Sequence, residues 1–346
     1  MPRHEIEVDV LEGLERFAHA ELERRVGMRI RFRPAGRPGT LRFGYAGDLR
    51  ALLELRSVAA VYSVQGFAIP RPRALLGNQQ IAELTGAIEE VLALAPPGAY
   101  QTLRVSAAGE DSTVLTRLKG ELAQRLGLEV AADEGDLLLR LRKQARGDGW
   151  EVLVRLSPRP LATRPWRVCN RPGALNATLA YAMMELTVPA PEDMVLNVAC
   201  GSGTLLAERL LVCRAREAIG CDIDPAALAC ARENLRAAGL ARQTRLEQWD
   251  ATAMPLPDER VDVICADLPF GQLVGSHAEN EAFYPAVFAE AARVARPGAR
   301  MVLLTHEVRL LERVAWQFAD QWQLAELLRV RSGGMTPAAA LFHRQG

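Results

Sequence analysis

From residue 193 onward, short apolar runs alternate with helical segments, and this alternation limits the possible folds more than any other feature of the sequence. Strand-length apolar runs are expected at 195–199, 217–222, 245–249, 261–266 and 300–305. Such alternation is typical of a doubly wound parallel sheet. Two further runs, 324–330 and 338–343, indicate a closing antiparallel hairpin. We therefore predict an α/β, Rossmann-like domain with a mostly parallel seven-stranded sheet.

The first half of the sequence has a different organisation. Residues 4–69 show the order strand, helix, strand, strand, helix, strand, which is typical of a ferredoxin-like domain. The stretch 70–78 contains Pro70, Pro72 and Gly77 and is interpreted as a linker. Helices and strands are again expected over 80–156. The predicted domains are 1–69, 70–160 and 191–346, with a linker at 161–190.

The fourth apolar run of the C-terminal half ends in Asp267-Leu268-Pro269-Phe270. Ligands of open α/β sheets bind beyond the carboxyl ends of the strands. The Asp267 carboxylate and the Leu268 carbonyl can accept the two hydrogens of an aromatic amine, which directs its lone pair at a methyl donor. Pro269 stiffens the turn, and Phe270 offers a stacking face. These four residues are the predicted catalytic residues for methylation of a ring-bound amino group.

A glycine-containing turn follows the first of these strands, in the stretch from Asn197 to Thr204. Its glycines allow a close approach to a ligand at a helix N-terminus. Leu206 replaces the third glycine of the dinucleotide fingerprint, which argues against a nicotinamide cofactor. Acids at two later strand ends, Asp222 and Asp250, can bind ribose hydroxyls and an adenine amino group. The pattern predicts an adenosine cofactor that carries a methyl group, bound by Asn197, Ala199, Cys200, Gly201, Ser202, Gly203, Asp222, Ile223, Asp250, Ala251 and Asp267.

Composition limits the remaining possibilities. The formal net charge of the 346 residues is zero, but arginines crowd the stretches 24–42 and 140–171, which indicates local basic faces. No apolar run approaches the roughly 18 residues of a membrane span, and the N-terminus is charged where a signal peptide is apolar. We expect a cytoplasmic, monomeric protein that binds no membrane.

The six cysteines show no Cys-x-x-Cys spacing. Zinc sites and disulfide frameworks both rely on characteristic cysteine spacings. We therefore predict neither a metal site nor a disulfide, and we interpret the cysteines as small core residues.

These motifs together resemble a known family. Residues 193–346 resemble class I S-adenosylmethionine-dependent methyltransferases, and the motif at Asp267 resembles the Asp/Asn-Pro-Pro-Tyr/Phe motif of amino-methylating enzymes. The whole chain resembles the THUMP-domain guanine-N2 methyltransferases of tRNA. The segments Leu161–Arg167 and Pro172–Ala180 resemble that family's passage from the THUMP domain into the catalytic domain.

The resemblance implies a methyl transfer from S-adenosylmethionine to the 2-amino group of a guanosine in tRNA, giving N2-methylguanosine. The form of the Asp267 motif resembles the members that act at position 6 of the acceptor stem, so the acceptor stem and 3′ end of tRNA are the implied partners. The resemblance further implies that Thr178 borders the methionine end of the cofactor. With RNA as the implied substrate, Arg164, Arg167 and Arg171 are the predicted contacts to RNA phosphates. One departure is Asn197, where family members usually carry an aspartate.

Several alternatives stay open at this stage. Within the enzyme class, the substrate could be large-subunit (23S) ribosomal RNA or position 10 of tRNA. Those ribosomal RNA enzymes typically carry Asn-Pro-Pro-Tyr, whereas Leu268 and Phe270 favour tRNA. In a different class, the chain could be a noncatalytic RNA-binding protein whose cofactor site has decayed, for which Asn197 is the only hint.

Overall fold

The computed structural model describes residues 4–34, 36–145, 147–269, 276–331 and 334–346. The chain divides into two compact units. The first comprises residues 1–10 and 15–163, and the second comprises residues 11–14 and 164–346. Each unit is described by itself.

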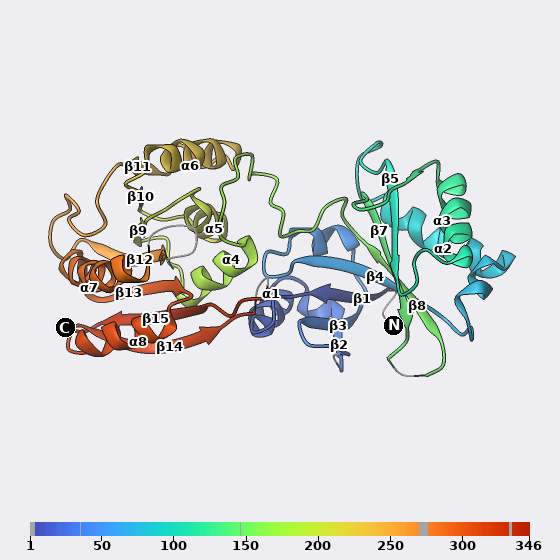
Figure 1. The fold of residues 1–346 in the computed structure, drawn as a ribbon, viewed down its shortest axis with the longest axis horizontal. Helices are drawn as coiled ribbons and strands as arrows, with labels where there is room; N and C mark the ends of the chain where they lie inside the picture. Colours follow the sequence, from blue (N-terminus) through green and yellow to red (C-terminus); the bar gives the residue numbers. More distant parts are fainter. Residues whose placement is uncertain (1–3, 35, 146, 270–275, 332–333) are drawn as a thin grey trace. The chain divides into compact units, whose positions relative to one another are not determined.

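The N-terminal unit is built on one mixed sheet, whose described residues form eight strands in the order β2-β3-β1-β4-β8-β7-β5-β6. Its elements are β1 (His4–Asp9), α1 (Glu15–Val26), η1 (Gly27–Arg29), β2 (Ile30–Arg33), β3 (Thr40–Tyr45), η2 (Leu49–Glu54), β4 (Ala60–Phe67), η3 (Pro72–Leu76), α2 (Asn78–Leu92), β5 (Thr102–Ala107), α3 (Thr113–Leu126), β6 (Glu129–Val130), β7 (Leu137–Lys143) and β8 (Trp150–Arg155). Figure 1 labels most of these elements.

The strand β4 links the two halves of this unit, because it pairs antiparallel with both β1 and β8. The predicted boundary between residues 69 and 70 therefore falls inside a single sheet, and the division into a ferredoxin-like and a THUMP domain stays a prediction. The second helix expected within residues 4–69 is the 3-10 helix η2. Its start follows the expected rule, because the Asp48 side chain accepts a hydrogen bond from the backbone N–H of Arg50.

The second unit contains the predicted α/β domain. Its elements are α4 (Ala177–Leu186), β9 (Met194–Val198), α5 (Thr204–Val212), β10 (Glu217–Cys221), α6 (Pro225–Ala237), β11 (Arg245–Glu247), β12 (Val261–Asp267), α7 (His277–Val294), β13 (Ala295–Thr305), α8 (Val308–Gln317), β14 (Trp322–Arg329) and β15 (Ala338–Arg344). The helix α4 begins at Ala177, because the Asn176 side chain caps it by accepting from the Thr178 N–H.

The described strands of this unit form a seven-stranded sheet in the order β11-β10-β9-β12-β13-β15-β14. The strands from β11 to β13 are parallel, and β13, β15 and β14 pair antiparallel. This arrangement confirms the predicted α/β fold with a closing hairpin. The strand order reverses at the β9–β12 pair, so the carboxyl ends of these two strands form the switch point at which such sheets bind ligands.

Helices cover both faces of the sheet (Figure 1). On one face, α7 and α8 share a core with strand residues such as Leu196, Ile264 and Leu303. On the other face, α5 and α6 pack with Trp166 and Ala218. Burial of both faces explains why the strands are apolar runs without alternation. In the part of the chain that the structure describes, no helix is both long and apolar enough to cross a membrane.

Candidate functional site

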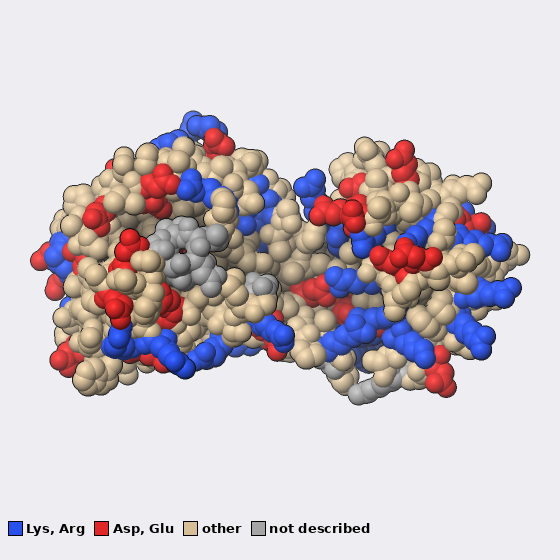
Figure 2. All heavy atoms as spheres, in the orientation of Figure 1, with Lys and Arg blue, Asp and Glu red and all other residues tan. Residues whose placement is uncertain are grey.

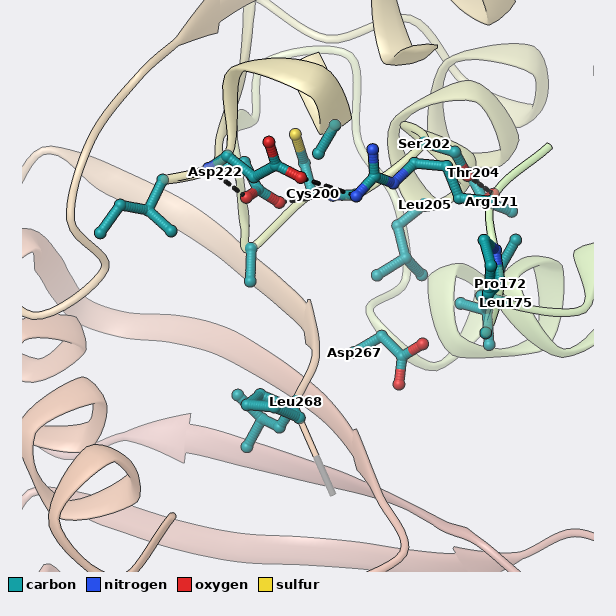
Figure 3. Close-up of a pocket in the computed structure, with 18 of the residues that line it drawn as sticks. Arg171, Pro172, Leu175, Cys200, Ser202, Thr204, Leu205, Asp222, Asp267 and Leu268 are labelled. Carbon is teal, nitrogen blue, oxygen red and sulfur yellow. Dashed lines mark hydrogen bonds and ion pairs between the residues drawn. The ribbon is translucent and has the colours of Figure 1, made fainter. Parts of the chain in front are cut away.

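A cavity of about 390 Å³ lies at the carboxyl ends of the central strands of the second unit. It is lined by the turn after β9, by the end of β10, by Asp267 and Leu268 at the end of β12, and by the segment 171–175. Figure 3 shows Asp222 and Asp267 in this lining. The cavity thus joins the predicted cofactor turn to the predicted catalytic motif.

The turn after β9, which lines the cavity, has unusual backbone dihedral angles. Ala199, Gly201 and Gly203 all have positive φ, at 47°, 54° and 78°. A Cβ atom at Gly201 would have no protein atom within 4 Å, so the space beside this glycine is open. A side chain at Gly203 would press on Ala231 of α6, with the Cβ atoms 3.2 Å apart. Glycine at 201 therefore leaves room for a ligand, and glycine at 203 lets α6 approach.

Asp222 is held rigidly beside this turn. One carboxylate oxygen accepts from the Gly201 N–H at 2.9 Å, and the other accepts from the Asp224 N–H at 3.0 Å. The neighbouring Ile223 lines the cavity and is 68% exposed. A fixed carboxylate beside an exposed apolar side chain can bind ribose hydroxyls and an adenine ring. With the open space at Gly201, these residues fit the adenosine half of S-adenosylmethionine.

Seven of the predicted cofactor-binding residues line the cavity, and they are Ala199, Cys200, Gly201, Ser202, Asp222, Ile223 and Asp267. Thr178, Asn197, Gly203, Asp250 and Ala251 are not part of its lining. The Asp250 side chain is exposed and accepts from the N–H and hydroxyl of Thr252, which lowers its pKa. Thr178 is fully buried, and its hydroxyl donates to Asn176. Cofactor contacts stay predictions for all twelve residues, and seven of the twelve line the cavity.

Asn197 lies inside the sheet, completely buried on β9. Its Nδ2 donates to the Cys265 carbonyl on the neighbouring strand β12 at 3.0 Å, while no partner is found for its Oδ1 among the described residues. An aspartate here could not donate this hydrogen bond. The amide therefore ties β9 to β12 at the base of the site.

Asp267 has the most unusual environment in the cavity. No side chain or backbone group of the described residues donates a hydrogen bond to its carboxylate, and burial raises its pKa to about 7. Its neighbour Leu268 is buried, and the Leu268 N–H donates to the Leu304 carbonyl on β13 at 2.9 Å. Among the described residues, the Asp267 carboxylate is thus an acceptor without a donor, on a rigid strand end. Phe270, the predicted stacking residue, lies outside the described residues.

The raised pKa predicts a pH dependence for any reaction that needs the Asp267 carboxylate as an acceptor. Below pH 7 the group is mostly protonated, so kcat/KM should fall about tenfold per pH unit below 7 and level off above it. The measurement is kcat/KM for methyl transfer between pH 5.5 and 8.5, and the control is the residual rate of Asp267→Asn, which should lack this step. A flat wild-type profile across pH 7 would contradict the assignment.

The sequence did not predict that the whole of segment 171–175 lines the cavity. Residues 172–175 belong to a stretch that resembles the family. Arg171 forms an ion pair with Asp224 at 2.6 Å, and its side chain is 36% exposed. Phe283 of α7 also lines the cavity and was not predicted. Phe283 directly precedes Tyr284, and nothing in the sequence distinguishes it from a core residue.

Two of the predicted RNA contacts have internal partners instead. Arg164 is 5% exposed and pairs with the fully buried Glu208 at 2.9 Å. Arg167 donates to the Leu175 carbonyl at 2.7 Å and to the Thr204 hydroxyl at 2.9 Å, and burial lowers its pKa. The expectation for Arg164 is therefore corrected, because a buried, paired guanidinium is not available to a phosphate. Arg167, which is half-buried, and Arg171 stay predicted RNA contacts.

A disulfide joins Cys169 to Cys230 of α6, so the prediction of no disulfide was wrong. The Asn234 side chain supports the same connection, because its Nδ2 donates to the Cys169 and Ser202 carbonyls and its Oδ1 accepts from the Cys169 N–H. The partners are 61 residues apart in the sequence, so no local pattern reveals them. Cys200, Cys221 and Cys265 are buried core residues, as predicted.

We expect this disulfide to contribute strongly to stability. Closing a loop of 61 residues restricts the unfolded chain, and such links typically stabilise by about 2 to 4 kcal/mol. Cys169→Ser should lower the free energy of unfolding in urea by this amount, and a thiol reductant should have the same effect on the wild type. Cys213→Ser, at a free cysteine, is the control. Identical midpoints for Cys169→Ser and the wild type would contradict the prediction.

Comparison with known proteins identifies the fold and the family. The crystal structure of TrmN from Thermus thermophilus superposes with a TM-score of 0.74 at 25% identity, covering 99% of this chain and all of that one. The UPF0020 family model, described as an RMKL-like methyltransferase domain, matches residues 164–338, which is half of the chain. The chain belongs to this methyltransferase family. S-adenosylmethionine is accordingly its cofactor, as predicted, and the residues lining the cavity fit it.

Two curated relatives of this methyltransferase domain have named substrates. The mouse (Mus musculus) "tRNA (guanine(6)-N(2))-methyltransferase THUMP3" is 31% identical over 187 residues, covering 50% of this chain and 37% of that protein. The cattle (Bos taurus) "U6 snRNA (guanine-N(2))-methyltransferase THUMPD2" is 29% identical over 219 residues, covering 60% and 41%. The matches thus cover less than half the length of these relatives.

Proposed function

We propose that this protein transfers the methyl group of S-adenosylmethionine to the 2-amino group of a guanosine in tRNA, at position 6 of the acceptor stem, giving N2-methylguanosine. The observation that carries the proposal is the unpaired Asp267 carboxylate in one cavity with the turn at Gly201. The named activity of the mouse relative supports the guanine amine as the acceptor.

The guanine amine is a poor nucleophile because its lone pair is delocalised into the ring. The Asp267 carboxylate accepts one amino hydrogen, and the Leu268 carbonyl accepts the other. The Leu268 carbonyl is available for this role because no donor to it is found among the described residues. When bound, S-adenosylmethionine would supply the methyl group: the nitrogen–carbon bond forms as the carbon–sulfur bond breaks, S-adenosylhomocysteine is released, and the proton lost by the nitrogen passes to the Asp267 carboxylate. Catalysis is then largely positioning and electrostatics. A paired guanine must first leave its helix, which costs a few kcal/mol that protein contacts offset.

The N-terminal unit supports RNA as the substrate. Basic side chains gather on the face of this unit shown in Figure 2. A second cavity, of about 350 Å³, is lined by five basic and three acidic side chains. Arg42 pairs with Glu151, and Arg142 pairs with Glu7 and Glu151, whereas Arg37 and Lys143 are exposed. Exposed cations of this kind bind phosphates. We propose that Arg37 and Lys143 contact the acceptor end of a tRNA, and that the protein acts as a cytoplasmic monomer.

Two measurements test the substrate. Cofactor titration by calorimetry should show binding, whereas a noncatalytic RNA-binding protein with a decayed site would bind none. Mass spectrometry of nuclease-digested RNA from a strain lacking the gene should show loss of one N2-methylguanosine at position 6 of a tRNA. Loss of N2-methylguanosine from ribosomal RNA, from tRNA position 10 or from a small nuclear RNA would overturn the tRNA position that we propose. The cattle relative makes the last of these a specific alternative.

A further inference from the structure

The segment that follows β12 is held from two sides. On one side, the Leu268 N–H donates to the Leu304 carbonyl of β13. On the other, the Pro269 carbonyl accepts two hydrogen bonds from α7, one from Asn280 Nδ2 at 3.0 Å and one from the Tyr284 hydroxyl at 2.8 Å. Two donors on one carbonyl use both of its lone pairs. Pro269 therefore has no acceptor capacity left for a substrate.

The two donors are themselves fixed by the end of β13 and the residues after it. The Tyr284 hydroxyl lies 2.7 Å from the Thr305 hydroxyl, which accepts from the Glu307 N–H at 2.9 Å. Since Tyr284 donates to Pro269, the Thr305 hydroxyl donates to Tyr284. The second N–H of Asn280 donates to the Glu307 carboxylate at 2.8 Å, and the other oxygen of that carboxylate contacts His277. Each of the donated hydrogens in this network of hydrogen bonds has one acceptor.

Burial makes this arrangement rigid. Asn280, Tyr284 and Thr305 are each at most 1% exposed. None of the three lines the cavity, so they have no direct contact with a ligand there. Buried polar groups that are fully paired specify one geometry, because any other leaves a donor or acceptor unsatisfied. The network thus fixes the peptide group next to the Leu268 carbonyl.

We propose that Asn280, Tyr284 and Thr305 are positioning residues for methyl transfer: they bind the Pro269 carbonyl and thereby hold the Leu268 carbonyl and the Asp267 carboxylate in place for the two amine hydrogens. This inference rests on the proposed function, because it concerns the acceptor geometry for an amine. A displacement of about 1 Å at such a site costs on the order of a hundredfold in rate.

The test compares substitutions that change one hydroxyl each. Tyr284→Phe and Thr305→Val remove a hydroxyl at nearly constant volume, and Thr305→Ser keeps it. Tyr100→Phe is the matched control, because the buried Tyr100 hydroxyl also donates to a backbone carbonyl, that of Leu156 at 2.9 Å in the N-terminal unit. The rate is measured as total labelled methyl transferred to bulk tRNA at saturating cofactor, with the cofactor Kd measured separately.

We expect Tyr284→Phe and Thr305→Val to lower kcat about tenfold while the cofactor Kd and the KM for tRNA stay within about twofold. Thr305→Ser and Tyr100→Phe should keep kcat within about twofold of the wild type. An unchanged kcat in Tyr284→Phe would overturn the proposal, as would a cofactor affinity that falls in proportion to kcat. The methylated nucleoside, identified separately, tests the proposed function: labelled N6-methyladenosine would refute guanine as the substrate and leave the positioning role intact.

Discussion

Asp267→Ala should lower the proposed methyl transfer to tRNA by about 10²- to 10³-fold, because it removes the acceptor that we propose orients the amine in the transition state. Cofactor affinity should persist, since the fixed carboxylate of Asp222 and the open turn at Gly201 stay in place. The measurement is single-turnover transfer of labelled methyl, together with calorimetric titration of S-adenosylmethionine.

Asp267→Asn separates chemistry from folding. Burial disfavours the charged carboxylate, as its raised pKa shows, so a neutral amide of the same size should not lower the melting temperature. Methyl transfer should still be lost, because the amide presents one acceptor oxygen without the charge. If Asp267→Ala lost transfer and cofactor binding equally, Asp267 would be a structural residue.

Arg164→Leu should lower the free energy of unfolding by about 3 to 5 kcal/mol, which is the usual cost of leaving one charge of a buried ion pair without its partner. The stranded group is Glu208, which is fully buried on α5. Urea unfolding measures the effect. The double substitution Arg164→Leu with Glu208→Leu should recover much of the loss, because it removes both charges.

The exposed pair Arg125–Glu121 supplies the control for this experiment. Both side chains are about 40% exposed, so Arg125→Leu should change stability by less than about 1 kcal/mol. If Arg164→Leu instead left stability unchanged and weakened tRNA binding, Arg164 would be a phosphate contact and the buried ion pair would be unimportant.

The C-terminal domain could be predicted from sequence because its signals are local. A strand buried on both faces needs a continuous apolar run, and a turn that approaches a ligand needs residues such as Gly201, so both are readable in a few consecutive residues. The carboxyl ends of neighbouring parallel strands lie at one edge of the sheet. That rule alone predicted that Asp222 and Asp267 line one site, and both line the cavity.

The same rule did not decide the environment of each side chain. Asp250 also follows a strand, yet its carboxylate turns to Thr252 and does not line the cavity. The helical spacing of Tyr284 predicts a buried residue, which it is, but it does not show that its hydroxyl binds Pro269. Hydrogen bonds between elements depend on how these elements pack, and a pattern within one element contains no information on that.

The amino-acid sequence by itself determined the α/β class of the C-terminal domain, the glycine turn and the acid at the end of β12, because each follows from backbone conformation over a few residues. Only the tertiary structure decided that Arg164 pairs with Glu208, 44 residues away, and that Cys169 bonds to Cys230, 61 residues away. Such partners meet only once the chain has folded. Folding also removes water from the surroundings of Arg164 and Asp267. Without water, the buried Arg164 needs an internal partner, and the pKa of Asp267 is raised.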